Sequence, residues 1–422
     1  MSEIIIVGGG ASGLMAAVKC AEKNNRVFVF EHQKILGKKL LITGKGRCNL
    51  TNNSDTDNIL KNIPRNPRFM YSSLNSFNAY DTMEFFENLG VRLKTERGKR
   101  VFPESDKSSD IVDTLVNRAK SLGVKFIFEN VKDIIIDDDK VVGVKTNKGE
   151  YFSDAVIVAT GGKSYPKTGS TGDGYRFAEK LGINVTEITP SLVPIETEEK
   201  FVSELMGLSL RNVVLKLFES GSTKPVFEEL GEMLFTHFGV SGPLVLSSSA
   251  HMKSGVKYRY EIDLKPGLDE KKLDDRILRD FSLNTNRAIS NTLTKLLPSS
   301  LILPILNMCK IEPSLKVNSV TKEHRKALIK IIKGMPLSVK GKRPIDEAVI
   351  TRGGIDIKEI NPKTMESKRI NSLYFIGEVL DVDAYTGGFN LQIAFSTANA
   401  VSFSAASRIS NAFRKFRISF SI

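Results

Sequence analysis

Cysteine and histidine are scarce in this sequence of 422 residues. The three cysteines, Cys20, Cys48 and Cys309, are an odd number at wide spacing and include no Cys-X-X-Cys pair. That pattern argues against a disulfide framework and against a dithiol relay, and it favours a cytoplasmic protein. The four histidines are scattered over positions 32, 237, 251 and 324 and show no metal-ligand spacing. We therefore predict a cytoplasmic protein without a metal site.

Long apolar runs are also missing. A membrane-spanning helix needs about 20 apolar residues, and the run at residues 301–306 is short and interrupted by Pro304. The first strand begins almost at once, which leaves no room for a signal peptide. We find no internal repeats and no low-complexity tracts. With 41% hydrophobic and 26% charged residues the chain is predicted to be globular, and its length predicts two or three domains.

The most informative stretch stands at the beginning of the chain. An apolar run at residues 4–7 leads into Gly8-Gly9-Gly10-Ala11-Ser12-Gly13 and then into a second apolar segment. This order predicts a buried strand, a tight turn and a helix. Gly8 would make the turn, Gly10 would let the backbone approach a diphosphate, and Gly13 would let the helix pack on the strand. The pattern predicts a dinucleotide site.

A second predicted strand, residues 27–30, ends in Glu31, which lies 18 residues beyond Gly13. A carboxylate there would accept hydrogen bonds from ribose hydroxyls and repel a 2′-phosphate. The chain holds only one Gly-X-Gly-X-X-Gly motif. A nicotinamide donor would therefore bind without a fingerprint of its own, in the same cleft.

Other elements can be predicted from apolar spacing. Residues 108–121 have a helical pattern with Ser109 as N-cap. Strand-like runs at 124–128, 131–136, 141–146 and 151–152 predict a small antiparallel insertion. A buried strand at 373–378 and a helix over 393–406 would return to the first domain. The tail from Arg408 holds four cations and no acid, so it would add to any basic surface.

Residues 36–52 read Leu-Gly-Lys-Lys-Leu-Leu-Ile-Thr-Gly-Lys-Gly-Arg-Cys-Asn-Leu-Thr-Asn. With the glycine turn, this stretch closely resembles a family of bacterial flavoproteins, the aminoacetone-oxidase-like or BaiN/YhiN-like oxidoreductases. Further matches lie at residues 96–103, 160–162, 164–174, 233–243 and 387–392. The resemblance implies FAD as cofactor and NAD(P)H as a transient donor. It also implies an α/β fold, a Rossmann-like two-dinucleotide-binding FAD domain with an inserted β-domain and a basic helical cap.

The resemblance further implies which residues hold the cofactor. Glu378 and Asp381 would lie near its ribityl and phosphate part, and Asn390 and Leu391 at the flavin edge, where helix N–H groups stabilise an anionic hydroquinone. The predicted FAD-binding residues are Gly8, Gly10, Ala11, Ser12, Gly13, Glu31, His32, Lys38, Lys39, Gly44, Arg47, Cys48, Asn49, Val131, Thr160, Gly161, Gly162, Glu378, Asp381, Gly388, Phe389, Asn390 and Leu391.

The middle of the chain has a different pattern and most of the excess charge. Short β-like runs begin near residue 190, and helical patterns follow at 269–281, 286–297, 300–308 and 322–332. We predict an FAD domain of residues 1–190 and 344–422, an inserted β-domain of residues 191–264, and a basic helical cap of residues 265–343. The net charge is +13, and the cap holds 17 Lys or Arg against 7 Asp or Glu. Such a patch is typical of proteins that meet nucleic acid, although a solvated lysine-rich surface gives the same count.

The reaction stays open between several classes. The family has been associated with reduction of conjugated carbon–carbon double bonds, in steroid-like enones for some members and in uridine of large-subunit ribosomal RNA for others. Its older name implies amine oxidation, and a non-catalytic ribosome-binding flavoprotein is a further alternative. The concentrated positive charge favours RNA, since a bile-acid enzyme has no need of it. For a uracil acceptor Cys48, beside Arg47, is the first candidate acid and His237 the second, although packing alone explains either residue.

Overall fold

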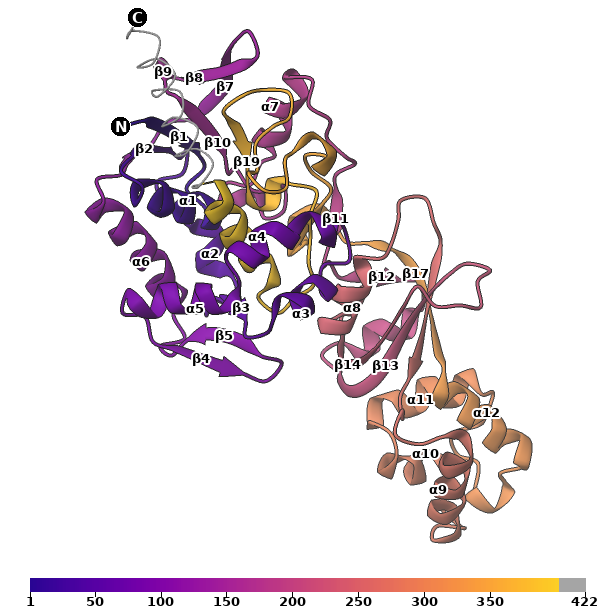
Figure 1. Ribbon diagram of the computed structural model, residues 1–422. Helices are drawn as coiled ribbons and strands as arrows, with labels where there is room; N and C mark the ends of the chain where they lie inside the picture. Colours follow the sequence, from indigo (N-terminus) through magenta and orange to yellow (C-terminus); the bar gives the residue numbers. More distant parts are fainter. Residues whose placement is uncertain (402–422) are drawn as a thin grey trace, which may run out of the picture. The chain divides into compact units, whose positions relative to one another are not determined.

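Five parallel strands form the centre of the first of two units into which the chain divides (Figure 1). The computed structural model describes residues 1–401. Unit 1 comprises residues 1–191 together with the chain from residue 345 onward, and unit 2 comprises residues 192–344. The sequence placed these boundaries after residues 190 and 343. The predicted cationic tail from Arg408 lies outside the described residues.

The parallel sheet of unit 1 confirms the predicted α/β class. Its strands lie in the order β19, β10, β1, β2 and β6. Val7 at the end of β1 pairs with Val158 of β10 on one side and with Phe30 of β2 on the other. Apolar β-branched residues predominate because both faces of such a sheet are covered by helices. The bounds are β1 (Glu3–Val7), β2 (Arg26–Phe30), β6 (Lys125–Ile127), β10 (Ala155–Val158) and β19 (Leu373–Phe375).

One strand belongs to a different sheet from the one the sequence predicts. Residues 124–128 were expected in the antiparallel insertion, but β6 pairs parallel with β2, Phe28 opposite Lys125. The physical reason is the helix before it, since a strand that follows a crossover helix returns to the same parallel sheet. The insertion itself is the antiparallel sheet of β7 (Val131–Asp137), β8 (Lys140–Thr146) and β9 (Glu150–Phe152).

Helices cover the parallel sheet, and α1 packs against α6. Along α1 nearly every residue is buried, which explains its run of small and apolar side chains. The helices of unit 1 are α1 (Ala11–Ala21), α2 (Lys38–Ile42), α3 (Thr56–Lys61), α4 (Tyr71–Ser76), α5 (Ala79–Asn88), α6 (Ser108–Ser121) and α7 (Asp173–Lys180). Residues 389–401 are also helical. Two small sheets complete the unit, one of β3 (Thr51–Asn52), β5 (Arg100–Pro103) and β4 (Leu93–Glu96), the other of β11 (Thr189–Ser191) and β18 (Ile350–Arg352).

Unit 2 is built on a closed barrel of six strands in the order β12, β15, β14, β13, β16 and β17. The barrel closes because β12 pairs with both β15 and β17. Its strands are β12 (Ile195–Thr197), β13 (Ser209–Glu219), β14 (Phe227–Phe235), β15 (Gly239–Ser241), β16 (Tyr258–Asp263) and β17 (Met335–Lys342), and the short helix α8 (Pro243–Ser249) follows β15. The sequence placed residues 335–342 in the helical cap, whereas they form β17.

Four helices lie between β16 and β17 and gather at one end of the barrel (Figure 1). They are α9 (Glu270–Ser282), α10 (Ile289–Thr292), α11 (Ser299–Met308) and α12 (Lys322–Lys333). We call residues 265–334 the helical subdomain. Its buried residues share one hydrophobic cluster with the barrel. None of the helices within residues 1–401 is long and apolar enough to cross a bilayer.

Candidate functional site

The candidate site of unit 1 lies where the carboxyl ends of β1, β2 and β10 meet their following loops. A cavity there encloses about 970 Å³ of space that protein atoms do not fill, part of it open to solvent. The predicted residues on its lining are Gly8, Gly10, Ala11, Ser12, Glu31, Lys38, Lys39, Thr160, Gly161, Glu378, Asn390 and Leu391. A second cavity of about 360 Å³ shares Gly8, Glu31, Thr160 and Gly169 with the first and adds His32 and Val131. Ligands of open parallel sheets bind at this end of the strands.

The three glycines of the N-terminal motif have three different environments. Gly8 has φ +109°, and a Cβ on it would lie 2.5 Å from the carbonyl oxygen of Ala159, which directly follows the neighbouring strand β10. A Cβ on Gly13 would lie 1.9 Å from the Gly8 carbonyl oxygen, so helix and turn touch there. A Cβ on Gly10 would meet no atom within 4 Å. The open space in front of Gly10, at the start of α1, is where a diphosphate fits.

Glu31 at the end of β2 is held by two backbone donors. Its Oε2 accepts a hydrogen bond from Gly9 N and its Oε1 one from Gln33 N, both at 2.8 Å. The carboxylate is therefore fixed on the glycine turn while it lines both cavities. A fixed carboxylate with remaining lone pairs is suited to ribose hydroxyls.

Lys39 and Glu378 form an ion pair at the cavity. Lys39 Nζ lies 2.7 Å from Glu378 Oε2 and donates to Ser164 Oγ at 2.7 Å. The other carboxylate oxygen of Glu378 accepts from Ser164 Oγ and from Thr351 N, each at 3.0 Å. Thr351 Oγ1 in turn accepts from the backbone N of Ser164 and of Lys163. The sequence analysis gave no role to Thr351, and no local pattern marks it.

Gly162 is part of the same arrangement. A Cβ there would lie 2.3 Å from Thr351 Oγ1 and 2.7 Å from Glu378 Oε1. The glycine thus allows β10, β18 and Glu378 to approach one another. Lys38, unlike Lys39, has no carboxylate partner among the described ion pairs. Its Nζ donates to the carbonyl of Lys167 at 2.8 Å and to Gln33 Oε1 at 3.2 Å. Lys38 therefore ties the loop of residues 164–172 to the segment after β2.

Cys48 lies off the cavity lining, and its environment differs from the predicted one. The sequence analysis expected Arg47 to activate the thiol, but Arg47 forms ion pairs with Glu96 and Asp106 instead. Its guanidinium also lies 4.2 Å from the centre of the Phe102 ring. Cys48 is fully buried, and burial raises the pKa of its thiol to about 12. The expectation of a thiol poised by Arg47 is therefore wrong, because Glu96 of β4 and Asp106, which follows β5, pair with the cation.

Asn49 and Gly388 join the two ends of unit 1. In the orientation that satisfies both of its amide atoms, Asn49 accepts from Gly388 N at 3.0 Å and donates to Thr51 O at 3.3 Å. A Cβ on Gly388 would lie 2.3 Å from the Thr51 carbonyl oxygen, which explains the glycine. The side chain of Asn390 forms two hydrogen bonds with the loop that precedes it. Its Oδ1 accepts from Ala384 N, and its Nδ2 donates to Ala384 O. The helix that begins at residue 389 is thus fixed against β3.

Asp381 and Asp383 are buried close to arginines. Asp381 Oδ2 accepts from Arg65 Nη2 at 2.7 Å, and Asp383 Oδ2 accepts from Ser191 Oγ at 2.8 Å. The Oδ1 atom of each has no hydrogen-bond partner within residues 1–401. Burial raises the pKa of Asp383 above that of an ordinary carboxyl. Sequence reasoning assigned Asp381 to the cofactor and missed Arg65 as its partner, 316 residues away.

The remaining predicted residues are more distant from the cavities. His237 lies in unit 2, exposed between β14 and β15, with its ring 4.9 Å from that of Phe238. Those predicted residues of unit 1 that do not line either cavity are Gly13, Gly44, Arg47, Cys48, Asn49, Gly162, Asp381, Gly388 and Phe389. In the described part of the chain no cluster of three or more His, Cys, Asp or Glu is placed to hold a metal ion.

Comparisons with known proteins agree on one family. The family model described as HI0933-like protein Rossmann domain matches residues 2–404. The ribosomal RNA dihydrouridine synthase of Haemophilus influenzae is 33% identical over 409 residues, which are 96% of this chain and 98% of that protein. The 3-dehydro-bile acid delta(4,6)-reductase of Clostridium scindens is 29% identical over 97% of this chain and 100% of its own.

A solved structure supports the same fold. The 3-ketosteroid delta1-dehydrogenase of Sterolibacterium denitrificans matches with a TM-score of 0.52 and 13% identity, over 97% of this chain and 100% of that one. The glycine turn, the fixed carboxylate of Glu31 and the open space at Gly10 are features that an FAD site of this fold requires. The resemblance found in the sequence is confirmed, and the chain belongs to the HI0933-like family of FAD-dependent oxidoreductases.

Proposed function

We propose that the protein uses FAD to reduce uridine to dihydrouridine in large-subunit ribosomal RNA, in the cytoplasm, with NAD(P)H as reductant. Two relatives carry the name ribosomal RNA dihydrouridine synthase, one from Haemophilus influenzae at 33% identity and one from Escherichia coli at 30% identity. Each match spans more than nine-tenths of both chains. An activated carbon–carbon double bond is the shared substrate chemistry of this proposal and of the bile-acid reductase match.

The single observation that favours RNA is the separation of charge within unit 2. The helical subdomain holds 14 Lys or Arg against 7 Asp or Glu, whereas the rest of unit 2 holds 10 of each. A steroid-like substrate such as a bile acid offers such a surface a single carboxylate at most. A folded RNA offers phosphates, and their neutralisation supplies much of the affinity in protein–nucleic acid complexes.

We propose the following cofactor contacts from the geometry of unit 1. The backbone at residues 8–13 would bind the diphosphate, and Glu31 the adenosine ribose. His32 and Val131, on the lining of the smaller cavity, would contact the adenine. Asn390 and Leu391 would lie at the flavin edge. When bound, FAD supplies the hydride transfer.

Reduction of uridine adds a hydride at C6 and a proton at C5, so the chain or the solvent must supply an acid. Cys48 and His237 remain the proposed candidates. With a pKa of about 12, Cys48 holds its proton throughout the physiological range, as a donor must. Its complete burial argues for a packing role unless the loop of residues 44–49 opens. His237 is exposed on the surface of unit 2.

The decisive test measures dihydrouridine in ribosomal RNA from a strain that lacks the gene. We expect the modification to disappear, and to return when the wild-type chain is supplied. Persistence of the modification in the deletion strain would exclude the proposal. Complementation by Cys48→Ala tests the acid, and Cys20→Ala is its matched control because Cys20 is equally buried in unit 1 with a thiol pKa of about 12. A catalytic Cys48 predicts failure of the first variant alone.

A second candidate function is the reduction of a small steroid-like enone, which the match to the Clostridium scindens enzyme favours. Such an enzyme would consume NAD(P)H with an enone in the absence of RNA. The test compares the turnover of a 3-keto-4-ene steroid by the purified flavoprotein with its turnover of ribosomal RNA. Rapid turnover of the steroid with none of the RNA would favour this alternative.

A further inference from the structure

We propose that helix α12 carries a docking surface for the sugar–phosphate backbone of double-helical RNA, formed by Lys322, Lys326 and Lys330. The proposal rests on the RNA substrate proposed above and goes beyond it, because it names the residues and the form of RNA that they contact. It also separates the docking of the RNA from the chemistry at the cavity of unit 1.

The five cations of α12 are of two kinds. Arg325 Nε donates to Asp274 Oδ1 of α9 at 2.9 Å, and Lys333 Nζ lies 2.6 Å from Asp263 Oδ2 of β16. These two side chains are largely buried, with 17% and 19% of their surface exposed. They hold the helix against its neighbours. Lys322, Lys326 and Lys330 are exposed instead, and none of the ion pairs found within residues 1–401 includes them. The acid near them on the same helix is Glu323, whose pKa is lowered by hydrogen bonds at the start of the helix and, in smaller part, by the charges of Lys326 and Lys322.

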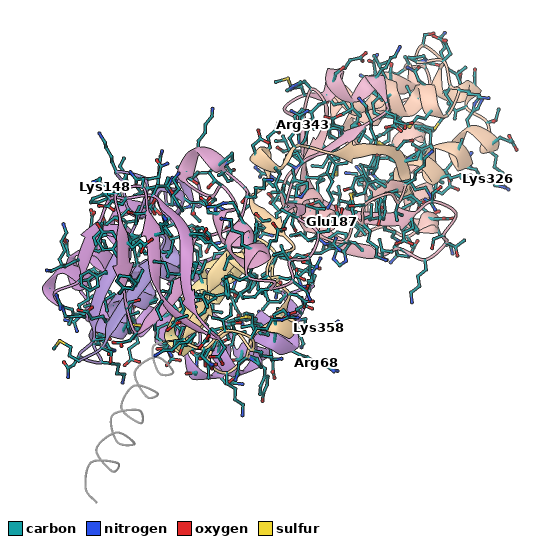
Figure 2. All side chains as sticks on the ribbon, turned by 90° about the horizontal axis from the view of Figure 1, so that it is seen from above. Arg68, Lys148, Glu187, Lys326, Arg343 and Lys358 are labelled. Carbon is teal, nitrogen blue, oxygen red and sulfur yellow. The ribbon has the colours of Figure 1, made fainter. Side chains whose placement is uncertain are left out.

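The spacing of the three lysines places them on one side of the helix. They recur every fourth residue, so each step advances by about 6 Å along the axis and by about 40° around it. The apolar residues Leu328, Ile329 and Ile332 of the same helix are buried in the core of unit 2. Figure 2 shows Lys326 on the surface of the helical subdomain, pointing away from the core. The result is an oblique row of three ammonium groups facing solvent.

The composition of the surface decides which form of RNA it fits. Proteins that bind single-stranded RNA stack the bases on aromatic side chains. The helical subdomain contains two aromatic residues of this kind, Phe281, which is only 6% exposed, and His324, whose Nδ1 accepts from the backbone N of Thr321 in the capping box of α12. Double-helical RNA is recognised through its shape, phosphates and 2′-hydroxyls. A row of lysines without an exposed Phe, Tyr or Trp beside it therefore fits the backbone of a duplex and leaves the unstacking of the target uridine to another part of the protein.

The test uses the full-length, FAD-loaded protein and two RNA probes, a duplex of about 16 base pairs and oligouridine of the same length. Binding is measured at KCl concentrations from about 50 to 200 mM. The triple variant Lys322→Gln, Lys326→Gln, Lys330→Gln is compared with Lys120→Gln, Lys125→Gln, Lys358→Gln, which removes the same charge from exposed positions of unit 1. Flavin absorbance and circular dichroism verify that both variants are folded.

We expect the wild-type protein to bind the duplex more tightly than oligouridine. The α12 variant should lose about 10- to 50-fold in affinity for the duplex, and the slope of log affinity against log salt should become shallower by about 2 to 3. The unit 1 variant should lose much less, although the same number of charges is removed. An α12 variant that binds the duplex like the wild type overturns the proposal, and so does a preference of the wild type for oligouridine.

Formation of dihydrouridine in ribosomal RNA by the same proteins separates the two proposals. If the α12 variant modifies RNA with unchanged kcat/KM, the proposed docking surface is refuted and the proposed substrate is supported. If duplex binding depends on α12 but no dihydrouridine forms, the docking surface is supported and the proposed substrate is refuted. A loss of kcat/KM at unchanged kcat in the α12 variant supports both.

Discussion

Cations near the cavity of unit 1 and cations on the outer side of α12 are used in opposite ways. Lys39 pairs with Glu378, Arg65 with Asp381, and Arg47 with Glu96 and Asp106. The row of Lys322, Lys326 and Lys330 has no such partners in the described chain. Paired cations fix loops in one position, whereas unpaired ones keep their charge for an anion from outside. Residue type alone therefore does not distinguish a cation that shapes a site from one that binds a ligand.

This difference also implies a difference in response to salt. The Lys39–Glu378 pair at the cavity is partly shielded from water, with 24% and 15% of the two side chains exposed, so counterions screen it weakly. The lysines of α12 are in contact with solvent and are screened at physiological ionic strength. Retention of FAD should accordingly be insensitive to salt over a range in which RNA affinity falls steeply.

The largest expected effect comes from the glycine turn, where backbone atoms approach one another closely. Gly13→Ala places a Cβ within 1.9 Å of the backbone oxygen of Gly8, and we expect it to cost about 3 kcal/mol or more in unfolding free energy. Gly10→Ala is the matched control, since its φ of −83° suits alanine and its Cβ meets no atom. We expect a cost below about 1 kcal/mol, but at least a tenfold loss of FAD affinity, because the methyl group occupies the space in front of the helix.

Thermal unfolding of the apoproteins and titration with FAD measure the two effects separately. A Gly10→Ala protein that is strongly destabilised, or that binds FAD like the wild type, would contradict this account of the turn. So would a Gly13→Ala protein of normal stability.

A smaller effect should distinguish a paired from an unpaired lysine. Lys39→Ala leaves the carboxylate of Glu378 without its cation in a partly buried site, and we expect a loss of about 1 to 3 kcal/mol in unfolding free energy. Lys326→Ala removes an exposed side chain and should change stability by no more than about 0.5 kcal/mol. A double-mutant cycle of Lys39→Ala with Glu378→Gln isolates the pair. Equal effects of the two lysine substitutions would remove the distinction between the regions.

The smallest effect is a pH dependence at Asp383. Its raised pKa means that the folded state favours the protonated carboxyl, so the carboxylate destabilises the fold increasingly as the pH rises above the unfolded pKa of about 4. Asp383→Asn removes that cost. We therefore expect the Tm difference, variant minus wild type, to become more positive between pH 4 and pH 7.

Asp106 provides the opposite case for the same measurement. Hydrogen bonds from Lys94 and Arg47 lower the pKa of this carboxyl, so it stabilises the fold above the unfolded pKa, and the stabilisation is lost as the pH falls. The Tm difference of Asp106→Asn should become more negative between pH 4 and pH 7. Parallel pH profiles for the two variants would contradict both assignments.

Much of the fold of unit 1 could be predicted from local patterns. The glycine turn and the apolar strands beside it are encoded within a few residues, and the predicted helix 108–121 has the bounds of α6. Its cap was predicted wrongly. Ser109 was expected as N-cap, but Lys107 takes that position without a side-chain cap, and Ser108 Oγ donates to Leu41 O instead. Local composition marks where a helix begins, but the partner of each hydroxyl depends on the tertiary structure.

The errors in unit 2 have a similar origin. The alternation of apolar and polar residues in β17 is short, and it lies in a lysine-rich stretch after α12. The barrel strand at residues 335–342 was therefore assigned to the helical cap. The helix predicted over 286–297 is reduced to α10 and one 3-10 turn, at Leu293–Lys295. β-branched residues and the proline at 298 lower the helix propensity of residues 286–297. The 3.6-residue spacing of apolar residues, on which the prediction was based, does not register this lower propensity.

The candidate site was predictable only where its residues are neighbours in sequence. The glycines and Glu31 follow from the strand–turn–helix pattern. The partners of Glu378 and Asp381 do not, because Ser164 and Arg65 are 214 and 316 residues away from them. The wrong prediction for Arg47 has this cause. Its partners Glu96 and Asp106 lie 49 and 59 residues further along the chain, and they bind the guanidinium in place of the Cys48 thiol.

The interrupted connectivity of unit 1 bears on the order of events during translation. When the ribosome has polymerised residue 344, the nascent chain contains all of unit 2, yet it still lacks β19 and the helix at residues 389–401. Since domains generally fold as units, unit 2 can fold first. The parallel sheet that carries the glycine turn is completed only later, when β19 has been synthesised. FAD then binds only after synthesis of the last strand and helix, and a released chain that ends near residue 350 should resist protease only across residues 192–344.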